Sequence, residues 1–178
     1  MPVVSIRSAQ IEDAAAIAHV HVQSWLTTYA GIVPAAYLAS LNEAKRVGSW
    51  QDQLERGVCV HLAELEEVVV GFASGGPIRE PLGDYGAELY AIYLLQAAQG
   101  KGIGRQLVGA LATTLLARDF TNMVVWVLEQ NPAVRFYEKT GAQHLARKQI
   151  EIGGVPLSEI ALGWSDLKRL LPGQMPPD

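Results

Sequence analysis

A nine-residue apolar run, AELYAIYLL at 87–95, constrains the fold of this chain more than any other segment. Polar and apolar residues hardly alternate within it, apart from Glu88, which is typical of a strand covered on both faces. The glycine-rich segment QGKGIG follows at 99–104, and from Ile103 apolar residues recur at helical spacing to about Arg118. A central strand, a glycine loop and a helix are therefore predicted in direct succession.

The other patterns predict a mixed sheet with helices on its faces. Helical spacing predicts one or two helices within 8–30, with Ser8 as a candidate N-cap, and further helices at 34–41, 43–55 and 131–141. The last of these has Asn131 as N-cap, Pro132 at the first helical position and Gly141 at the stop. Apolar, β-branched runs predict hairpins at 58–75 and 142–164 and a buried strand at 122–130.

Length and composition fit one globular domain spanning 1–178, with a core at about 4–164 and a proline-rich tail at 172–178. The formal charge of −4 argues against a partner nucleic acid, which requires a surplus of Lys and Arg. No apolar run approaches the ~20 residues that cross a membrane, and the N-terminus does not look like an export signal. We therefore expect a cytoplasmic protein. Cys59 stands alone and is expected to be a buried strand residue.

The glycine loop fits neither common phosphate-binding pattern. A P-loop needs Ser or Thr after its Gly-Lys, but Gly102 follows Lys101. The dinucleotide pattern needs a third glycine where this chain has Arg105 or Leu107. Yet the loop joins a strand to a helix, where free N–H groups and the helix dipole attract an anion, and Gly102 and Gly104 let a pyrophosphate approach the backbone. A long phosphorylated ligand is expected.

These residues carry a resemblance to a known family. QGKGIG matches the Q/R-x-x-G-x-G/A signature of the GNAT-type N-acetyltransferases, which bind acetyl-CoA. The run at 87–95 resembles the strand before that loop, NPAVRFYEKTGA at 131–142 resembles a later strand-to-helix segment, and 21–38 resembles the first helices of one bacterial branch. The resemblance extends from about Val4 to Trp164. It implies an α/β (α+β type) fold with a mixed, mainly antiparallel sheet of six or seven strands and splayed central strands.

The resemblance also implies how acetyl-CoA is bound, as cosubstrate and without a metal. The backbone of Ile92, Tyr93 and Leu94 would pair with the pantetheine arm, and Asn131 and Phe136 would contact it from the other side. The loop would hold the pyrophosphate through Gln99, Gly100, Lys101, Gly102, Ile103, Gly104 and Arg105. For the charges we expect Lys101 and Arg105 to meet the ligand and Lys139 to lie on a solvated helix face.

The implied reaction is direct acetyl transfer to a primary amine in a ternary complex, without an acyl-enzyme. Tyr137 matches the family's tyrosine, which lies near the sulfur and serves as general acid. Glu88 is the candidate base, because a carboxylate in a buried strand must be paired or face a cleft. Strand alternation places Glu88 on one face with Tyr90 and Ile92. The alternative for Glu88 is a strand-end position in solvent.

The acceptor site is less defined. His21, Trp25 and Tyr29 recur every four residues and share one helical face. Such a stripe is usually core, but in the resembling branch the first helices line the acceptor site, so Trp25, Tyr29 and Tyr90 are the candidate acceptor contacts. The four histidines are not spaced as metal ligands, and no metal is expected.

Two functions from different classes stay open at this point. One is an N-acetyltransferase acting on a small-molecule or peptide amine. The other is a non-catalytic module that binds acyl-CoA to sense or regulate. The sequence determines neither the acceptor nor the oligomeric state, although dimers are frequent in the resembling family.

Overall fold

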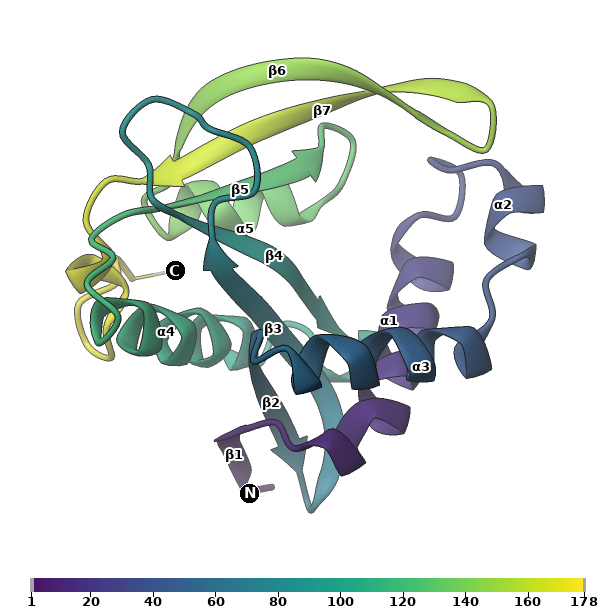
Figure 1. Ribbon diagram of the computed structural model, residues 1–178, viewed down its shortest axis with the longest axis horizontal. Coiled ribbons are helices and arrows are strands. Elements are labelled where there is room, and N and C mark those ends of the chain that lie inside the picture. Colours follow the sequence, from purple (N-terminus) through teal and green to yellow (C-terminus); the bar gives the residue numbers. More distant parts are fainter. Residues whose placement is uncertain (1, 178) are drawn as a thin grey trace.

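The computed structural model describes residues 2–177, and these form a seven-stranded sheet in the order β1-β2-β3-β4-β5-β7-β6. The strands are β1 (Val4–Ser8), β2 (Cys59–Leu65), β3 (Val68–Pro77), β4 (Ala87–Leu94), β5 (Met123–Leu128), β6 (Gln143–Ile152) and β7 (Val155–Trp164). Only β4 and β5 pair in parallel, and the other neighbours are antiparallel. The predicted mixed sheet with a central apolar strand is confirmed, because β4 is the fourth of the seven strands (Figure 1).

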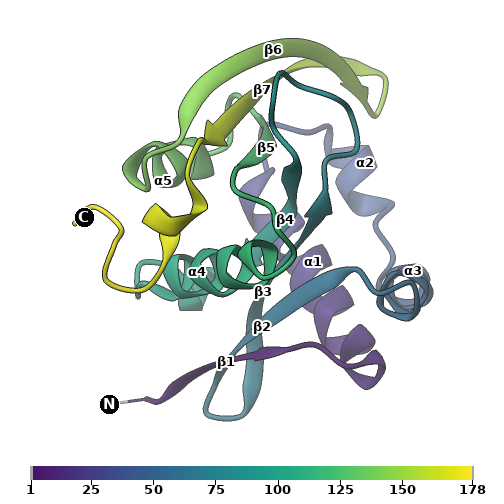
Figure 2. The ribbon, with the colours of Figure 1, turned by 60° about the vertical axis from the view of Figure 1, so that its left-hand side comes forward.

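Helices cover both faces of the sheet (Figure 2). They are α1 (Ala14–Thr28), α2 (Ala35–Ala39), α3 (Glu43–Glu55), α4 (Ile103–Leu116) and α5 (Ala133–Lys139), with short 3-10 turns η1 (Ile11–Asp13), η2 (Gln96–Ala98) and η3 (Leu167–Leu170). Buried residues of α4 and α5 share one core cluster, and α1 and α3 pack into another. The sheet is thus the middle layer of three.

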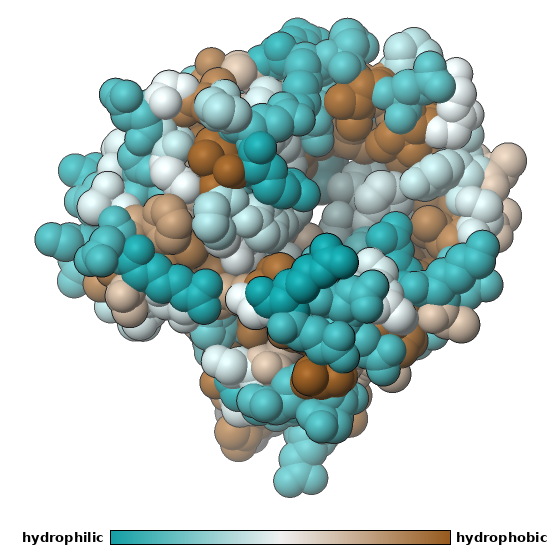
Figure 3. All heavy atoms as spheres, in the orientation of Figure 1, coloured by the Kyte–Doolittle hydropathy of each residue, from teal (hydrophilic) through white to brown (hydrophobic). Residues whose placement is uncertain are grey.

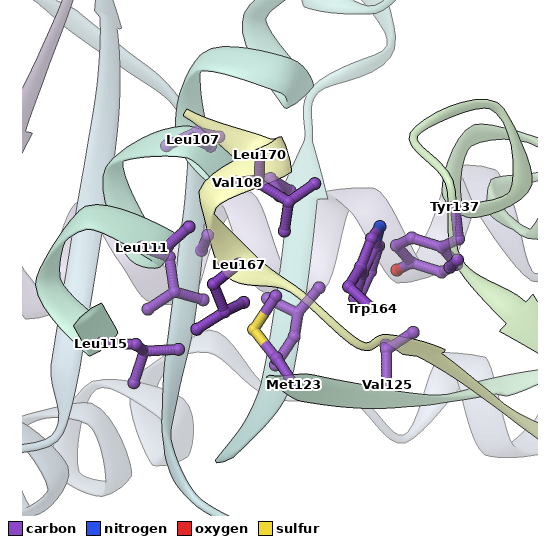
Figure 4. Packing of buried hydrophobic residues seen from close by; sticks show 14 of the residues in the cluster. Leu107, Val108, Leu111, Leu115, Met123, Val125, Tyr137, Trp164, Leu167 and Leu170 are labelled. Carbon is purple, nitrogen blue, oxygen red and sulfur yellow. The ribbon is translucent and has the colours of Figure 1, made fainter. Parts of the chain in front are cut away.

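The larger core lies between α4 and the sheet (Figure 4). Leu107, Leu111 and Leu115 are fully buried one helical turn apart, and Met123 of β5 and Leu167 of η3 lie beside them. Truncating a buried leucine of this kind to alanine costs about 2–5 kcal/mol. This packing fixes α4, and therefore the glycine loop at its N-terminus, against the end of β4.

The prediction of Ser8 as a helix N-cap was wrong. Ser8 is the last residue of β1 and pairs with His61 of β2. The helix starts later: the Gln10 backbone N–H donates to the Asp13 carboxylate over 2.7 Å in a capping box at η1, and α1 begins at Ala14. A five-residue strand carries little local pattern, because its stability comes from pairing with β2, far along the chain.

The predicted ends of the helix α5 agree with the structure to within one residue. The Asn131 Oδ1 accepts a hydrogen bond from the Ala133 N–H over 2.9 Å, and the helix starts at Ala133 rather than at Pro132. Gly141 follows the helix with a φ of +96°, a left-handed conformation that favours glycine. The acidic hairpin turn, the strand at 122–130 and the last hairpin also lie where they were predicted.

Within residues 2–177, no helix is long and apolar enough to cross a membrane. The same part of the chain contains no group of three or more His, Cys, Asp or Glu side chains that could hold a metal ion.

Candidate active site

The parallel strands β4 and β5, at the centre of the sheet, pair over only three residues. Ala87, Glu88 and Leu89 of β4 pair with Met123, Val124 and Val125 of β5. Both strands continue, to Leu94 and Leu128, and they diverge in space (Figures 1 and 2). The side of β4 that faces β5 therefore has backbone N–H and C=O groups without ladder partners on β5 from Tyr90 onward.

A β-bulge lies at the start of this opening. Ser74 of β3 pairs with Ala91 and the next residue, Gly75, pairs with Leu89, so β4 has one extra residue there. Because of this bulge, the prediction that Glu88, Tyr90 and Ile92 share one face was wrong for Ile92. Ile92 packs with the α4-side core, whereas Ala91 packs with the α1-side core, since the extra residue reverses the alternation.

A cavity of about 660 Å³ begins at the splayed strand and extends to the glycine loop. It is lined by Ser24, Thr27 and Thr28 of α1, by 92–94 of β4, by Gln96, Gln99, Gly100 and 102–105 of the loop and α4, and by 131–133, Phe136 and Lys139. Most of the predicted cofactor residues are therefore brought together. Lys101 and Tyr137 are not among the lining residues, and Lys139, expected on a solvated face, is.

The glycine loop ends in a helix N-terminus that opens into this cavity. Gly102 has a φ of +74° and is the N-cap of α4, and the Gln106 N–H donates to its carbonyl oxygen over 3.3 Å. The N–H groups of the first helical residues lie ahead of that hydrogen bond, as at any helix start, and the positive end of the helix dipole adds to them. No heavy atom lies within 4 Å of a Cβ placed on Gly102. The loop fits an anionic ligand.

Two further groups shape the loop. A Cβ on Gly104 would lie 3.3 Å from the Phe136 ring, so this glycine lets the α5 aromatic close against the helix start. Arg105 lines the cavity and its Nη1 donates to the Pro176 carbonyl oxygen over 2.7 Å. The C-terminal segment therefore contacts the helix start on which the cavity is built.

Tyr137 is buried beside the cavity wall. Its ring contacts those of Phe136 and Trp164 edge to face, with the Trp164 centroid 5.7 Å away, and it belongs to the α4-side core. Figure 4 shows it next to Trp164. Among the described residues its hydroxyl makes no hydrogen bond. Burial, with a smaller contribution from Tyr93, raises the pKa of the Tyr137 hydroxyl well above its usual range.

Glu88 is 2% exposed and lies in an ion pair with Arg79. The Arg79 Nε and Nη2 donate to Oε1 of Glu88, and the Arg79 backbone N–H donates to Oε2 over 3.0 Å. The same guanidinium lies over the Tyr90 ring, 4.6 Å from its centroid, and the Tyr90 hydroxyl donates to the Pro77 carbonyl. The solvent-exposed alternative for Glu88 is therefore excluded. The carboxylate is paired, and Glu88 and Tyr90 do share a face.

The helical stripe of α1 forms an aromatic cluster above β4. The ring centroids of Trp25 and Tyr29 are 4.5 Å apart, and His21 stacks on Tyr93 at 5.2 Å. The Trp50 Nε1–H donates to His21 Nδ1 over 3.1 Å, and burial lowers the pKa of His21 to about 4. Tyr29 is buried and Trp25 is half-buried. Neither lines the cavity, and both pack in a separate core cluster with residues of α2 and of the β6–β7 hairpin.

Sequence reasoning expected the first helices to line the acceptor site but missed the α1 residues that line this cavity. Ser24, Thr27 and Thr28 line it, and the only local signal was a set of small hydroxyl side chains next to the aromatic stripe. Arg79 was also missed, because it lies in a loop and meets Glu88 only through the folded β3–β4 connection. The sequence also gave no signal for the contact between Lys148 of β6 and Trp126 of β5, in which the Lys148 Nζ lies 4.1 Å from the Trp126 ring centroid across the intervening strand β7.

Comparison with known proteins identifies the family to which this chain belongs. Residues 22–142 match the sequence profile of the Acetyltransferase (GNAT) family. The chain belongs to the GNAT family of acetyltransferases. The matched residues run from α1 to the end of α5 and include the splayed strand, the glycine loop and most of the cavity wall. The family expected from QGKGIG is therefore confirmed, and with it the class of enzyme.

Individual GNAT relatives agree over nearly the whole chain. The uncharacterized N-acetyltransferase YuaI of Bacillus subtilis (strain 168) is 46% identical over 167 residues, which cover 94% of this chain and 96% of YuaI. The structure of yncA from Salmonella typhimurium, solved with its cofactor acetyl-CoA, has a TM-score of 0.69 at 26% identity, covering 92% and 94% of the two chains. The PaiA N-acetyltransferase of Thermoplasma acidophilum, in complex with coenzyme A, shares the fold, with a TM-score of 0.69 at 21% identity over 90% and 98% of the chains.

Proposed function

We propose that this GNAT protein transfers the acetyl group of acetyl-CoA directly to a primary amine of a small molecule or peptide, in a ternary complex. The observation that carries the proposal is the continuity of one cavity from the opened edge of β4 to the N-terminus of α4. Such a cavity accepts an extended ligand with an anionic end and a hydrogen-bonding arm.

The residues present fit acetyl-CoA. The loop N–H groups from Gly100 to Gly104 would hold its pyrophosphate, and the backbone of 92–94 would pair with its pantetheine arm. Asn131 and Phe136 lie on the opposite wall. When bound, acetyl-CoA supplies the activated acetyl thioester. The similarity to yncA, whose structure holds acetyl-CoA, supports this choice of cosubstrate.

Tyr137 would act as the proton donor. Its raised pKa keeps the hydroxyl protonated at neutral and moderately alkaline pH, so it can donate a hydrogen bond toward the leaving sulfur throughout that range. The same shift makes full proton transfer harder, unless the sulfur is also desolvated. Its lack of a hydrogen-bond partner among the described side chains leaves the hydroxyl available for this role.

Glu88 would accept the proton of the amine, and Trp25, Tyr29 and Tyr90 would border the acceptor. The ion pair with Arg79 sets a condition on this role, since a paired carboxylate reaches an amine only through water or by partial opening of the pair. The molecular face in Figure 3 is hollowed near its centre, with hydrophilic residues along the lower border of the hollow and hydrophobic residues at its upper right. We propose that a polar amine enters there. The cytoplasmic location stays a prediction.

A thiol-release screen tests the function. Purified protein, acetyl-CoA and a panel of polyamines, amino acids, aromatic amines and peptide N-termini are mixed, and free CoA thiol is followed with time. Amine-dependent release above the rate of spontaneous hydrolysis is the expected result. Tight binding of acetyl-CoA with no release for any amine class would instead favour the non-catalytic acyl-CoA-binding module.

A further inference from the structure

Ser24 is a buried hydroxyl that lines the cavity and has no hydrogen-bond partner within residues 2–177. The residue is 1% exposed, and its Oγ is fully buried. It lies on α1, which packs on β4 at Ala91 and Tyr93, and it lines the cavity together with Ile92–Leu94. Most buried hydroxyls in folded proteins are hydrogen-bonded, so an unpaired one at a ligand cavity requires an explanation.

The hydroxyl of the neighbouring Thr27 forms the hydrogen bonds that a hydroxyl on a helix usually forms. Thr27 also lines the cavity, and its hydroxyl donates to the carbonyl oxygens of Gln23 and Ser24, at 3.1 and 3.2 Å. A hydroxyl on a helix satisfies itself in this way without any ligand. Ser24 makes no such bond to the preceding turn. Its unpaired state destabilises the folded protein, because a buried hydroxyl without a partner has lost its hydrogen bonds to water and gained none in return.

We propose that Ser24 is a cosubstrate-binding residue whose hydroxyl hydrogen-bonds the pantetheine arm from the α1 wall of the cavity. The inference rests on the proposed function, because it requires CoA in the cavity. The arm carries two amide groups, each with an N–H and a C=O. One edge of an extended arm can pair with the β4 backbone in the manner of an added strand, and the polar groups that β4 leaves unpaired then need partners on the other walls of the cavity, of which α1 is one.

Isothermal titration with CoA, together with thermal unfolding of the free protein, tests this role. Ser24→Ala should weaken CoA binding by about three- to tenfold, as expected for loss of one neutral hydrogen bond. The same substitution should leave the melting temperature unchanged or raise it, since it removes an unpaired buried polar group. A purely structural residue would show the opposite pattern, a lower melting temperature with unchanged affinity.

Matched controls locate the contact. Thr113→Ala should leave the CoA affinity unchanged, because the Thr113 hydroxyl donates to the Gly109 carbonyl oxygen of its own helix and Thr113 does not line the cavity. Titration with pantetheine alone should reproduce the loss caused by Ser24→Ala, and titration with the adenosine bisphosphate half of CoA should not. Equal binding of CoA by Ser24→Ala and the wild type would overturn the inference, as would a loss that appears only with the nucleotide half. Failure of the wild type to bind CoA would overturn the proposed function itself.

Discussion

The side-chain amide of Asn131 donates a hydrogen bond to the Tyr29 hydroxyl over 3.0 Å, joining residues 102 positions apart in the sequence. The same Asn131 side chain accepts from the Ala133 N–H and so caps α5. One buried amide therefore connects the end of α1 to the start of α5, the two helices on either side of the cavity.

Tyr29→Phe should lower the free energy of unfolding by about 1–3 kcal/mol, because it leaves a buried amide donor of Asn131 unpaired. Urea denaturation measures the loss. Tyr37→Phe is the matched control, since no described residue hydrogen-bonds the Tyr37 hydroxyl, and it should change stability by less than the Tyr29 variant. Similar losses in both variants would show that the hydrogen bond between Asn131 and Tyr29 makes no specific contribution to the free energy of unfolding.

Gly102→Ala should weaken CoA binding at least tenfold. The φ of +74° at this position costs a residue with a Cβ about 1–2 kcal/mol, and any relaxation of the loop moves the N–H groups that would face the pyrophosphate. Gly83→Ala, at a φ of +52° in the β3–β4 loop, imposes similar strain away from the cavity. Gly83→Ala should lower stability without changing the CoA affinity. Equal CoA affinity of the two variants in the titration would show that the pyrophosphate binds elsewhere.

Tyr137→Phe should lower kcat by about 10²–10⁴ and leave CoA affinity and stability nearly unchanged. The hydroxyl forms no hydrogen bond within the described structure, so its removal costs the fold little. Because the raised pKa keeps Tyr137 protonated, the wild-type kcat should not fall with rising pH up to about pH 10 on account of this group. Full turnover by the variant on a good acceptor would remove Tyr137 from the mechanism.

Glu88→Gln separates a catalytic from a structural carboxylate. If Glu88 accepts the amine proton, the rate deficit should shrink as the pH approaches the pKa of the amine, where the amine loses its proton unaided. If it only pairs with Arg79, then Arg79→Met should lower stability to a similar extent, and the double variant should add little more. Initial rates across pH and a double-mutant cycle by denaturation distinguish the two, and a deficit independent of pH contradicts the base.

His21 should make stability depend on pH. Its pKa is about 4 in the folded protein, through burial and the charge of Arg46, and near 6.5 when unfolded. As pH falls below 6.5 the unfolded chain takes up a proton that the folded chain does not, so stability decreases between pH 6.5 and 4 and is unaffected by this group above that range. The loss at pH 5 should be about 2 kcal/mol. Denaturation of His21→Gln at pH 7 and 5 should show a smaller difference than the wild type, and an equal difference would assign the effect to other groups.

The sequence by itself determined the features that depend on neighbouring residues. The glycine spacing in QGKGIG, the capping of α5 by Asn131 and the turn glycine at Gly141 act within a few residues of backbone. Periodicity likewise located the apolar run of β4 and the buried face of α4, since burial on both faces or on one face determines which positions must be apolar. These local rules were enough to place the glycine loop between strand and helix.

Only the tertiary structure decided the features that depend on segments far apart in the chain. Ser8 became a strand residue because β2 was available to pair with it, and the bulge opposite Ser74 turned Ile92 away from the face of Glu88. Arg79 reached Glu88, and Ser24 was left unpaired at the cavity, only once the β3–β4 loop and α1 had packed on the sheet. Strand register and the partners of buried polar groups are set by long-range contacts, which no spacing within one segment encodes.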